Sequence, residues 1–73
     1  MSAGTKSIQI VVNGQVQGAP SGQSLIELLV SLGIDPARVA VELNRSIVRR
    51  EEWDNVQVGE GDTLEIVQFV GGG

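Results

Sequence analysis

Cysteine, histidine and tyrosine are all absent from the 73 residues of this sequence. Without cysteine, the chain has no disulfide, no thiolate nucleophile and no thiolate metal ligand. Without histidine, a Ser–His–Asp or Cys–His catalytic set cannot be built, and the usual general base near neutral pH is missing. These absences argue against an enzyme.

Basic residues are also scarce: five Lys and Arg stand against nine Asp and Glu, so the net charge is -4 and the pI is near 4.4. Such a surface does not neutralise phosphates, so nucleic acid is not an expected partner, whereas basic proteins are. Glu51 with Glu52, and Glu60 with Asp62, are expected on the solvated surface. Their spacing does not match a calcium loop, and no glycine pattern predicts a dinucleotide site. We therefore expect no metal site and no bound cofactor.

Long hydrophobic runs are missing as well. No apolar stretch approaches the roughly 20 residues that a bilayer requires, and residues 1–7 lack the apolar segment of a signal peptide. The sequence therefore predicts a protein without a membrane segment, and we expect it in the cytoplasm.

What is present fits one small domain, because a second core would have no room in a chain of this length. Residues 8–12 are β-branched and apolar and predict a strand, with Ile8, Ile10 and Val12 on its core face. Asn13-Gly14 predicts a tight hairpin turn. A short return strand over residues 15–17 and a loop over residues 18–22 are expected to follow.

The next segment has the pattern of an amphipathic helix. Ser24 and Glu27 match a capping box, and leucines recur at three- and four-residue steps as far as Leu32. Gly33 stands where the left-handed residue after a helix belongs. Pro36 then predicts a brief turn or a one-turn helix.

The second half of the chain predicts three further strands. They are expected over residues 39–43, 47–48 and 63–70, with turns over 44–46 and 59–62. Residues 49–53 are expected to form a helical turn that places Trp53 on the edge of the core. Within this turn, we expect Arg49 and Arg50 to form surface ion pairs with Glu51 and Glu52.

This element order predicts an α+β fold with one main helix packed across a mixed sheet of four to five strands. The first and last strands carry the most continuous β-branched runs, so they are expected to be parallel neighbours inside the sheet. Residues 1–70 would form this domain, and residues 71–73 a flexible glycine tail.

The tail is the candidate for chemistry. Gly71, Gly72 and Gly73 have no Cβ, so they can lie extended in a channel too narrow for side chains. Three extended residues carry a terminal carboxylate roughly 10 Å beyond the last packed residue. A partner enzyme could activate that carboxylate with ATP and pass it to a sulfur or amine nucleophile.

An apolar patch is predicted beside the tail. If Leu64 points to the helix, Val67 and Phe69 point to the open face of the sheet next to Glu65. With Val70, they form a candidate docking surface for a partner.

The sequence resembles the ThiS family, the bacterial sulfur carrier proteins of thiamine biosynthesis. The resemblance is carried by residues 39–44 (VAVELN), by the block from Ile47 through Arg50 to Trp53, and by residues 61–73 (GDTLEIVQFVGGG). Residues 8–14 and 24–32 fit as well, so the resemblance spans nearly the whole chain. Arg49, where relatives often have Pro, is a departure.

The resemblance implies a ubiquitin-like β-grasp fold and a set of partners. An E1-like adenylating enzyme, ThiF, would bind the sheet and adenylate Gly73 with ATP. A persulfide donor would supply sulfur to form a thiocarboxylate, and the carrier would then donate that sulfur to the thiazole ring on thiazole synthase, ThiG. Gly72 would be the penultimate residue of the threaded tail.

Three alternatives remain open at this point. The small subunit of molybdopterin synthase has the same fold and the same thiocarboxylate chemistry, although the block around Trp53 argues against it. A protein modifier would form an isopeptide bond with lysine. A non-catalytic β-grasp interaction domain would make no use of its tail.

Overall fold

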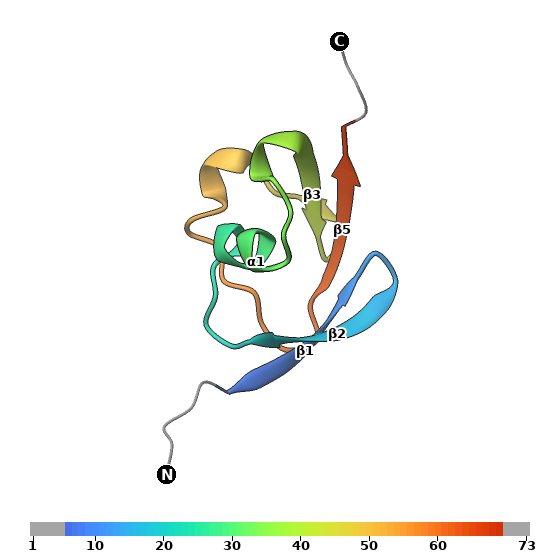
Figure 1. The fold of residues 1–73 in the computed structure, drawn as a ribbon, viewed down its shortest axis with the longest axis vertical. Coiled ribbons are helices and arrows are strands. Elements are labelled where there is room, and N and C mark those ends of the chain that lie inside the picture. The colour runs from blue at the N-terminus through green and yellow to red at the C-terminus, as the bar shows by residue number, and fades with distance from the viewer. Residues whose placement is uncertain (1–5, 70–73) are drawn as a thin grey trace.

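Alternating apolar residues build a five-stranded sheet that one α-helix crosses (Figure 1). The computed structural model describes residues 6–69. The strands lie in the order β2-β1-β5-β3-β4, with β1 parallel to β5 and the other neighbours antiparallel. Their bounds are β1 Ser7–Val12, β2 Gln15–Pro20, β3 Val39–Leu43, β4 Ser46–Ile47 and β5 Thr63–Gln68. This confirms the α+β prediction, including the two parallel strands inside the sheet.

The first hairpin turns as predicted, but its second strand is longer. Asn13 and Gly14 have φ values of 50° and 84°, as a two-residue turn between twisted strands requires. The prediction of a loop from residue 18 is wrong for its first part, because β2 continues to Pro20 opposite Ser7. Ala19 lies opposite Ile8 and is buried. This burial stabilises the longer strand, although the composition of residues 18–20 is typical of a loop.

Asn13 also extends the contact between β1 and β5. Only Val11 and Val12 align with Thr63 and Leu64 in the parallel ladder. Beyond it, the Asn13 Oδ1 accepts a hydrogen bond from the Ile66 amide at 2.7 Å, and the Asn13 Nδ2 donates to the Ile66 carbonyl at 3.2 Å. The Asn13 side chain thus makes the two hydrogen bonds to Ile66 that a further backbone pair between β1 and β5 would make.

The helix α1 (Leu25–Ser31) begins and ends where its sequence predicts. The Ser24 Oγ accepts from the Glu27 amide at 3.2 Å, and the Glu27 Oε1 accepts from the Ser24 amide at 2.9 Å. Gly33 has a φ of 77°, which glycine adopts without strain. Two 3₁₀ helices follow along the chain, η1 (Pro36–Arg38) and η2 (Arg50–Glu52).

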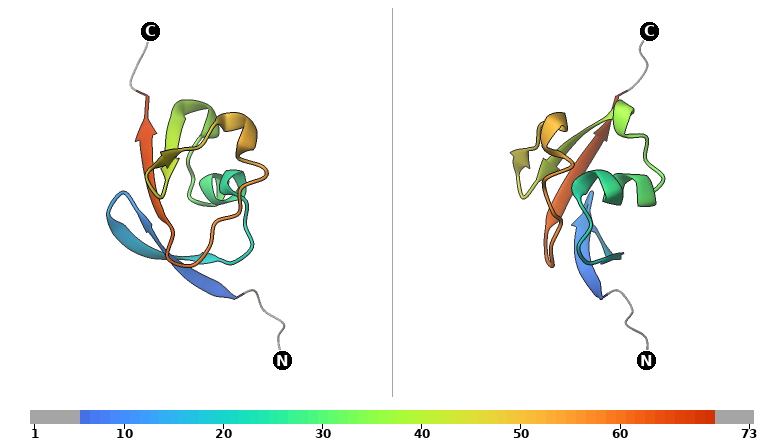
Figure 2. Two further views of the ribbon diagram at one scale, coloured as in Figure 1. Left: turned by 180° about the vertical axis from the view of Figure 1, so that it is seen from behind. Right: turned by 90° about the vertical axis from the view of Figure 1, so that its left-hand side faces the viewer.

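The core lies between α1 and one face of the sheet. Figure 2 shows from two sides that α1 covers this face only. Trp53 is 2% exposed and donates its Nε1 hydrogen to the Val48 carbonyl at 2.9 Å, so it is a full member of the core rather than a lid at its edge. The buried apolar residues are Ile10, Val12, Ala19, Leu25, Leu28, Leu29, Val39, Val41, Trp53, Val58 and Leu64.

Candidate functional site

The uncovered face of the sheet carries large apolar side chains. Along β5, Leu64 is fully buried, whereas Val67 and, just beyond the strand, Phe69 are 60% and 54% exposed. The strand alternation predicted both faces correctly. Ile47 of β4 is 75% exposed. Together with Ala40, these three residues form what we call the docking face (Ala40, Ile47, Val67 and Phe69).

The register of β3 with its neighbours brings the docking face together. Ala40 lies opposite Val67, and Glu42 lies between Ile47 and Glu65. These side chains and Val41 line a shallow, mostly apolar hollow of about 100 Å³. The contribution of Ile47 was missed from sequence, although the short antiparallel connection after Leu43 is the signal that places it there.

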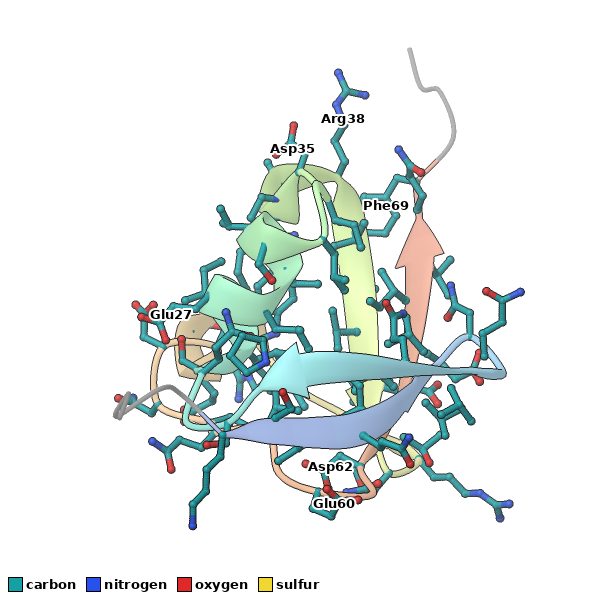
Figure 3. The ribbon with its side chains drawn as sticks, turned by 60° about the horizontal axis from the view of Figure 1, so that its bottom comes forward. Glu27, Asp35, Arg38, Glu60, Asp62 and Phe69 are labelled. Atoms are coloured by element: carbon teal, nitrogen blue, oxygen red, sulfur yellow. The ribbon has the colours of Figure 1, made fainter. Side chains whose placement is uncertain are left out.

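The end of β5 is anchored before the glycine tail. The Phe69 amide donates to the Arg38 carbonyl at 2.8 Å, one residue beyond the last residue of the strand. Figure 3 shows Phe69 at the tip of β5, at the same end of the molecule as Asp35 and Arg38. The predicted site residues Val70, Gly71, Gly72 and Gly73 lie outside the described residues.

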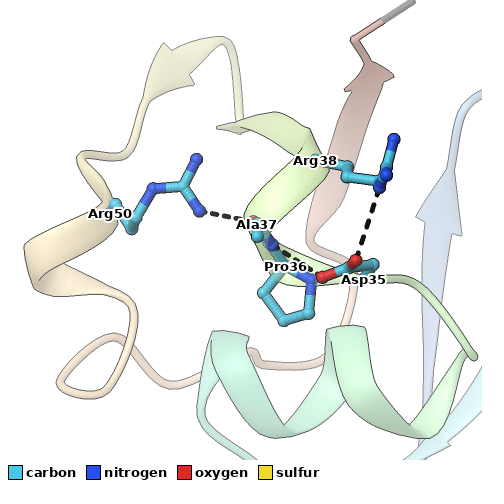
Figure 4. Close-up of polar contacts among 5 residues, drawn as sticks. All are labelled: Asp35, Pro36, Ala37, Arg38 and Arg50. Atoms are coloured by element: carbon cyan, nitrogen blue, oxygen red, sulfur yellow. Dashed lines mark hydrogen bonds and ion pairs between the residues drawn. The ribbon is translucent and has the colours of Figure 1, made fainter.

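Arg50 holds the turn that provides this anchor. Its guanidinium donates to the Pro36 carbonyl (Figure 4) and, at 3.3 Å, to the Val39 carbonyl. The guanidinium carbon lies 4.9 Å from the centre of the Trp53 ring, within the range of a cation–π contact. The two carbonyls flank Arg38, so Arg50 fixes the segment that receives the Phe69 amide.

This geometry corrects one expectation for residues 49–53. Arg49 does form the surface pair, with its Nη2 at 3.8 Å from the Glu51 Oε2. Arg50 does not pair with a carboxylate, because backbone carbonyls and the Trp53 ring occupy its guanidinium. A charge pattern could not reveal this role, because the acceptors come from residues 36 and 39.

The acidic residues near the other end of β5 have structural roles. The Glu60 Oε1 accepts from the Gln9 amide at 3.1 Å, and the Asp62 Oδ2 accepts from the Gly59 amide at 2.7 Å. The Asp62 Oδ1 accepts from the Asn44 Nδ2 at 3.1 Å. Figure 3 shows Glu60 and Asp62 at the opposite end of the molecule from Phe69. Among residues 6–69, no three acidic side chains gather as a metal-binding group.

Residues 6–69 have one further hollow, and their helices are short. A wide polar hollow of about 710 Å³ lies at the start of α1, where Ser24 and Glu27 already form the helix cap. Within this described part of the chain, no helix is both long and apolar enough to span a bilayer.

The fold and the site together indicate the structural class of this protein. A five-stranded mixed sheet with one helix across it is the β-grasp arrangement of ubiquitin-like proteins. An exposed apolar sheet face, a central strand anchored at its end and a following run of glycines are features of a ubiquitin-like carrier.

Comparison with known proteins identifies the family. The family model "ThiS family" matches residues 5–73, and the chain belongs to this family. It is 36% identical over 66 residues to the sulfur carrier protein ThiS of Escherichia coli, covering 90% of this chain and all of that one. The name of that relative describes a sulfur carrier.

A solved structure agrees with this assignment. The crystal structure of the thiamine biosynthesis protein ThiS from Geobacter metallireducens superposes with a TM-score of 0.77 at 33% identity. The match covers 90% of this chain and 100% of that protein. It confirms the ubiquitin-like β-grasp fold.

The chain also resembles part of a larger protein. It is 41% identical over 66 residues to the thiazole synthase of Paramagnetospirillum magneticum. The match covers 90% of this chain but spans only about 20% of that protein. A domain similar to this chain therefore occurs within a polypeptide named for thiazole synthesis.

Proposed function

We propose that this chain carries sulfur for thiazole formation on the carboxyl group of Gly73. A carboxylate oxygen attacks the α-phosphorus of ATP on an E1-like adenylating enzyme and displaces pyrophosphate. The terminal sulfur of a persulfide then attacks the carbonyl carbon of the adenylate, and AMP leaves. A thiol reduces the resulting disulfide bond and releases the thiocarboxylate, which donates its sulfur on a thiazole synthase. In this scheme the carrier itself binds no cofactor, and the partner adenylating enzyme consumes the ATP.

The observation that carries the proposal is the apolar face along the central strand. Val67 and Phe69 are more than half exposed, and they lie four and two residues before Gly71 in the sequence. A glycine tail offers no side chains for recognition, so a partner has to obtain its binding energy from the domain. We assign docking to Val67 and Phe69, with Val70 next in sequence, and threading to Gly71 and Gly72.

The similarity to thiazole synthases supports the identity of the acceptor. Two relatives so named, from Paramagnetospirillum magneticum and Magnetococcus marinus, each contain a matching region that is 41% identical to this chain. Presence in one polypeptide keeps a carrier close to the enzyme that uses it. We infer that this chain meets a thiazole synthase as its acceptor, and that these reactions take place in the cytoplasm.

Reconstitution tests the proposal. The chain ending at Gly73 is incubated with an E1-like adenylating enzyme, ATP and a persulfide donor, and its intact mass is measured. We expect a mass increase that corresponds to the exchange of one oxygen for one sulfur at Gly73. The thiocarboxylate form should then support thiazole formation by thiazole synthase.

The control is the chain that lacks Gly72 and Gly73. It should keep the melting temperature of the parent, because the docking face and the rest of the domain remain. It should acquire no sulfur, because the reacting carboxyl group is misplaced. Sulfur transfer to this shortened chain would contradict the role of Gly73. A thiocarboxylate that serves molybdopterin synthesis but not thiazole formation would identify the pterin pathway instead.

A further inference from the structure

Two carboxylates lie directly opposite each other on the docking face. Glu42 of β3 is the cross-strand partner of Glu65 of β5. Directly opposite residues in antiparallel strands have Cβ atoms about 4.5–5.5 Å apart, and like charges in that arrangement are destabilising. The free domain therefore holds a repulsive pair in the middle of an open, half-apolar surface.

Within residues 6–69, nothing neutralises this pair. The ion pairs there join Arg38 to Asp35 and Arg49 to Glu51, so neither involves Glu42 or Glu65. The side-chain hydrogen bonds also leave both carboxylates without a donor from this part of the chain. The other surface acids Glu60 and Asp62, by contrast, bind backbone amides.

The surroundings of the pair are shaped for an amphipathic side chain. Glu42 and Glu65 line the same shallow hollow as Ala40, Ile47 and Val67. The stem of a Lys or Arg can lie on the apolar residues while its charged head reaches the two carboxylates. A single cation between two carboxylates removes their mutual repulsion and gains attraction from both.

We propose that Glu42 and Glu65 receive one Lys or Arg side chain from the adenylating enzyme. This inference rests on the proposed function, since it assumes that this enzyme binds the docking face. The net charge of -4 favours the approach of a basic partner surface, and the carboxylate pair then fixes where its cation lies. The pair is thus a specificity element within an otherwise apolar interface.

The proposal predicts opposite effects on stability and on binding. Replacing the pair by Glu42→Gln and Glu65→Gln removes the repulsion, so the melting temperature of the free domain should rise or stay unchanged. The same double change removes both acceptors of the partner's cation. Affinity for the adenylating enzyme should therefore fall about tenfold or more, and its dependence on salt should weaken.

The experiment is titration calorimetry of the full chain with the adenylating enzyme at low and high salt, together with thermal melting of each variant alone. Glu52→Gln is the matched control, because it makes the same chemical change at one exposed carboxylate in η2. It should leave the affinity within about twofold of the parent. Gel filtration of the parent over a range of concentrations tests whether a second copy of the chain occupies the face.

Four outcomes would overturn the inference. If the double variant binds as tightly as the control and is activated normally, the pair has no role in binding, while the proposed function stays intact. If the stability and the affinity of the double variant fall together, the two carboxylates are structural. A parent dimer that the double variant loses would assign the face to a second copy. Failure of the parent itself to bind the enzyme would refute the proposed function together with this inference.

Discussion

Arg50→Ala tests whether Arg50, packed on Trp53, holds the segment that anchors the end of β5. The change removes two hydrogen bonds from a charged donor, to the Pro36 and Val39 carbonyls, and one cation–π contact with Trp53. A hydrogen bond to a charged group contributes about 1.5–3 kcal/mol, and an exposed cation–π contact about 0.5–1 kcal/mol. At the low end of these ranges, the three contacts together contribute about 3.5 kcal/mol. Because Arg50 is exposed to solvent, which screens its charge, we discount this figure and expect a loss of about 2 kcal/mol.

The expected loss of stability in Arg50→Ala is large enough to measure. In a domain of this size, 1 kcal/mol shifts the melting temperature by about 4–8 °C, so Arg50→Ala should melt about 8–16 °C below the parent. Far-UV circular dichroism is the suitable signal, because Trp53 fluorescence would also report the lost contact directly. Arg50→Lys should recover part of the loss, since an ammonium keeps the charge but cannot bridge two carbonyls as a planar fork.

A local readout separates positioning from general stability. Hydrogen exchange of the Phe69 amide, which bonds to the Arg38 carbonyl, should accelerate in Arg50→Ala more than the exchange of core amides. Arg49→Ala is the matched control, because its exposed pair with Glu51 at 3.8 Å contributes at most about 1 kcal/mol. An Arg50→Ala variant that melts no lower than Arg49→Ala would refute the reasoning.

Three further changes test other links between sequence and structure. Asn13→Ala removes both hydrogen bonds to Ile66 and places alanine at a φ of 50°, so urea unfolding should show a loss of about 1–3 kcal/mol. Ser24→Ala removes the helix cap and should cost about 1 kcal/mol in the same assay, whereas Ser24→Asp should be near neutral. Phe69→Glu should weaken adenylation of Gly73 without lowering the melting temperature, because that side chain is 54% exposed; a melted domain would show instead that Phe69 supports the core.

The features that the sequence predicted correctly depend on neighbours along the chain. The capping box needs only Ser24 and Glu27, and the hairpin turn needs only Asn13 and Gly14. The outward direction of Val67 follows from the two-residue period of a strand once Leu64 is assigned to the core. Each of these conformations is determined by residues within one turn or one strand, so it depends little on tertiary packing.

The features that were missed depend on pairing between distant segments. The β2 strand runs to Pro20 because Ala19 gains burial opposite β1, a gain invisible in its loop-like composition. Arg50 was expected to pair with its acidic neighbours, but the fold brings two carbonyls and an aromatic ring within its reach. The opposition of Glu42 and Glu65 appears only when the β3–β5 register is known. The roles of residues 70–73 stay predictions.

In the proposed function, recognition and reaction occupy different parts of the chain. The carboxyl group of Gly73 is chemically ordinary, so an enzyme can distinguish it from other carboxylates only by binding the domain behind it. The docking face and the anchored end of β5 together set where that group is delivered, because Phe69 belongs to the exposed patch and also bonds to η1. Two partners that use the same face cannot bind at once. If thiazole synthase also binds the docking face, the carrier has to leave the adenylating enzyme before it reaches thiazole synthase, and the thiocarboxylate has to survive that interval in solution.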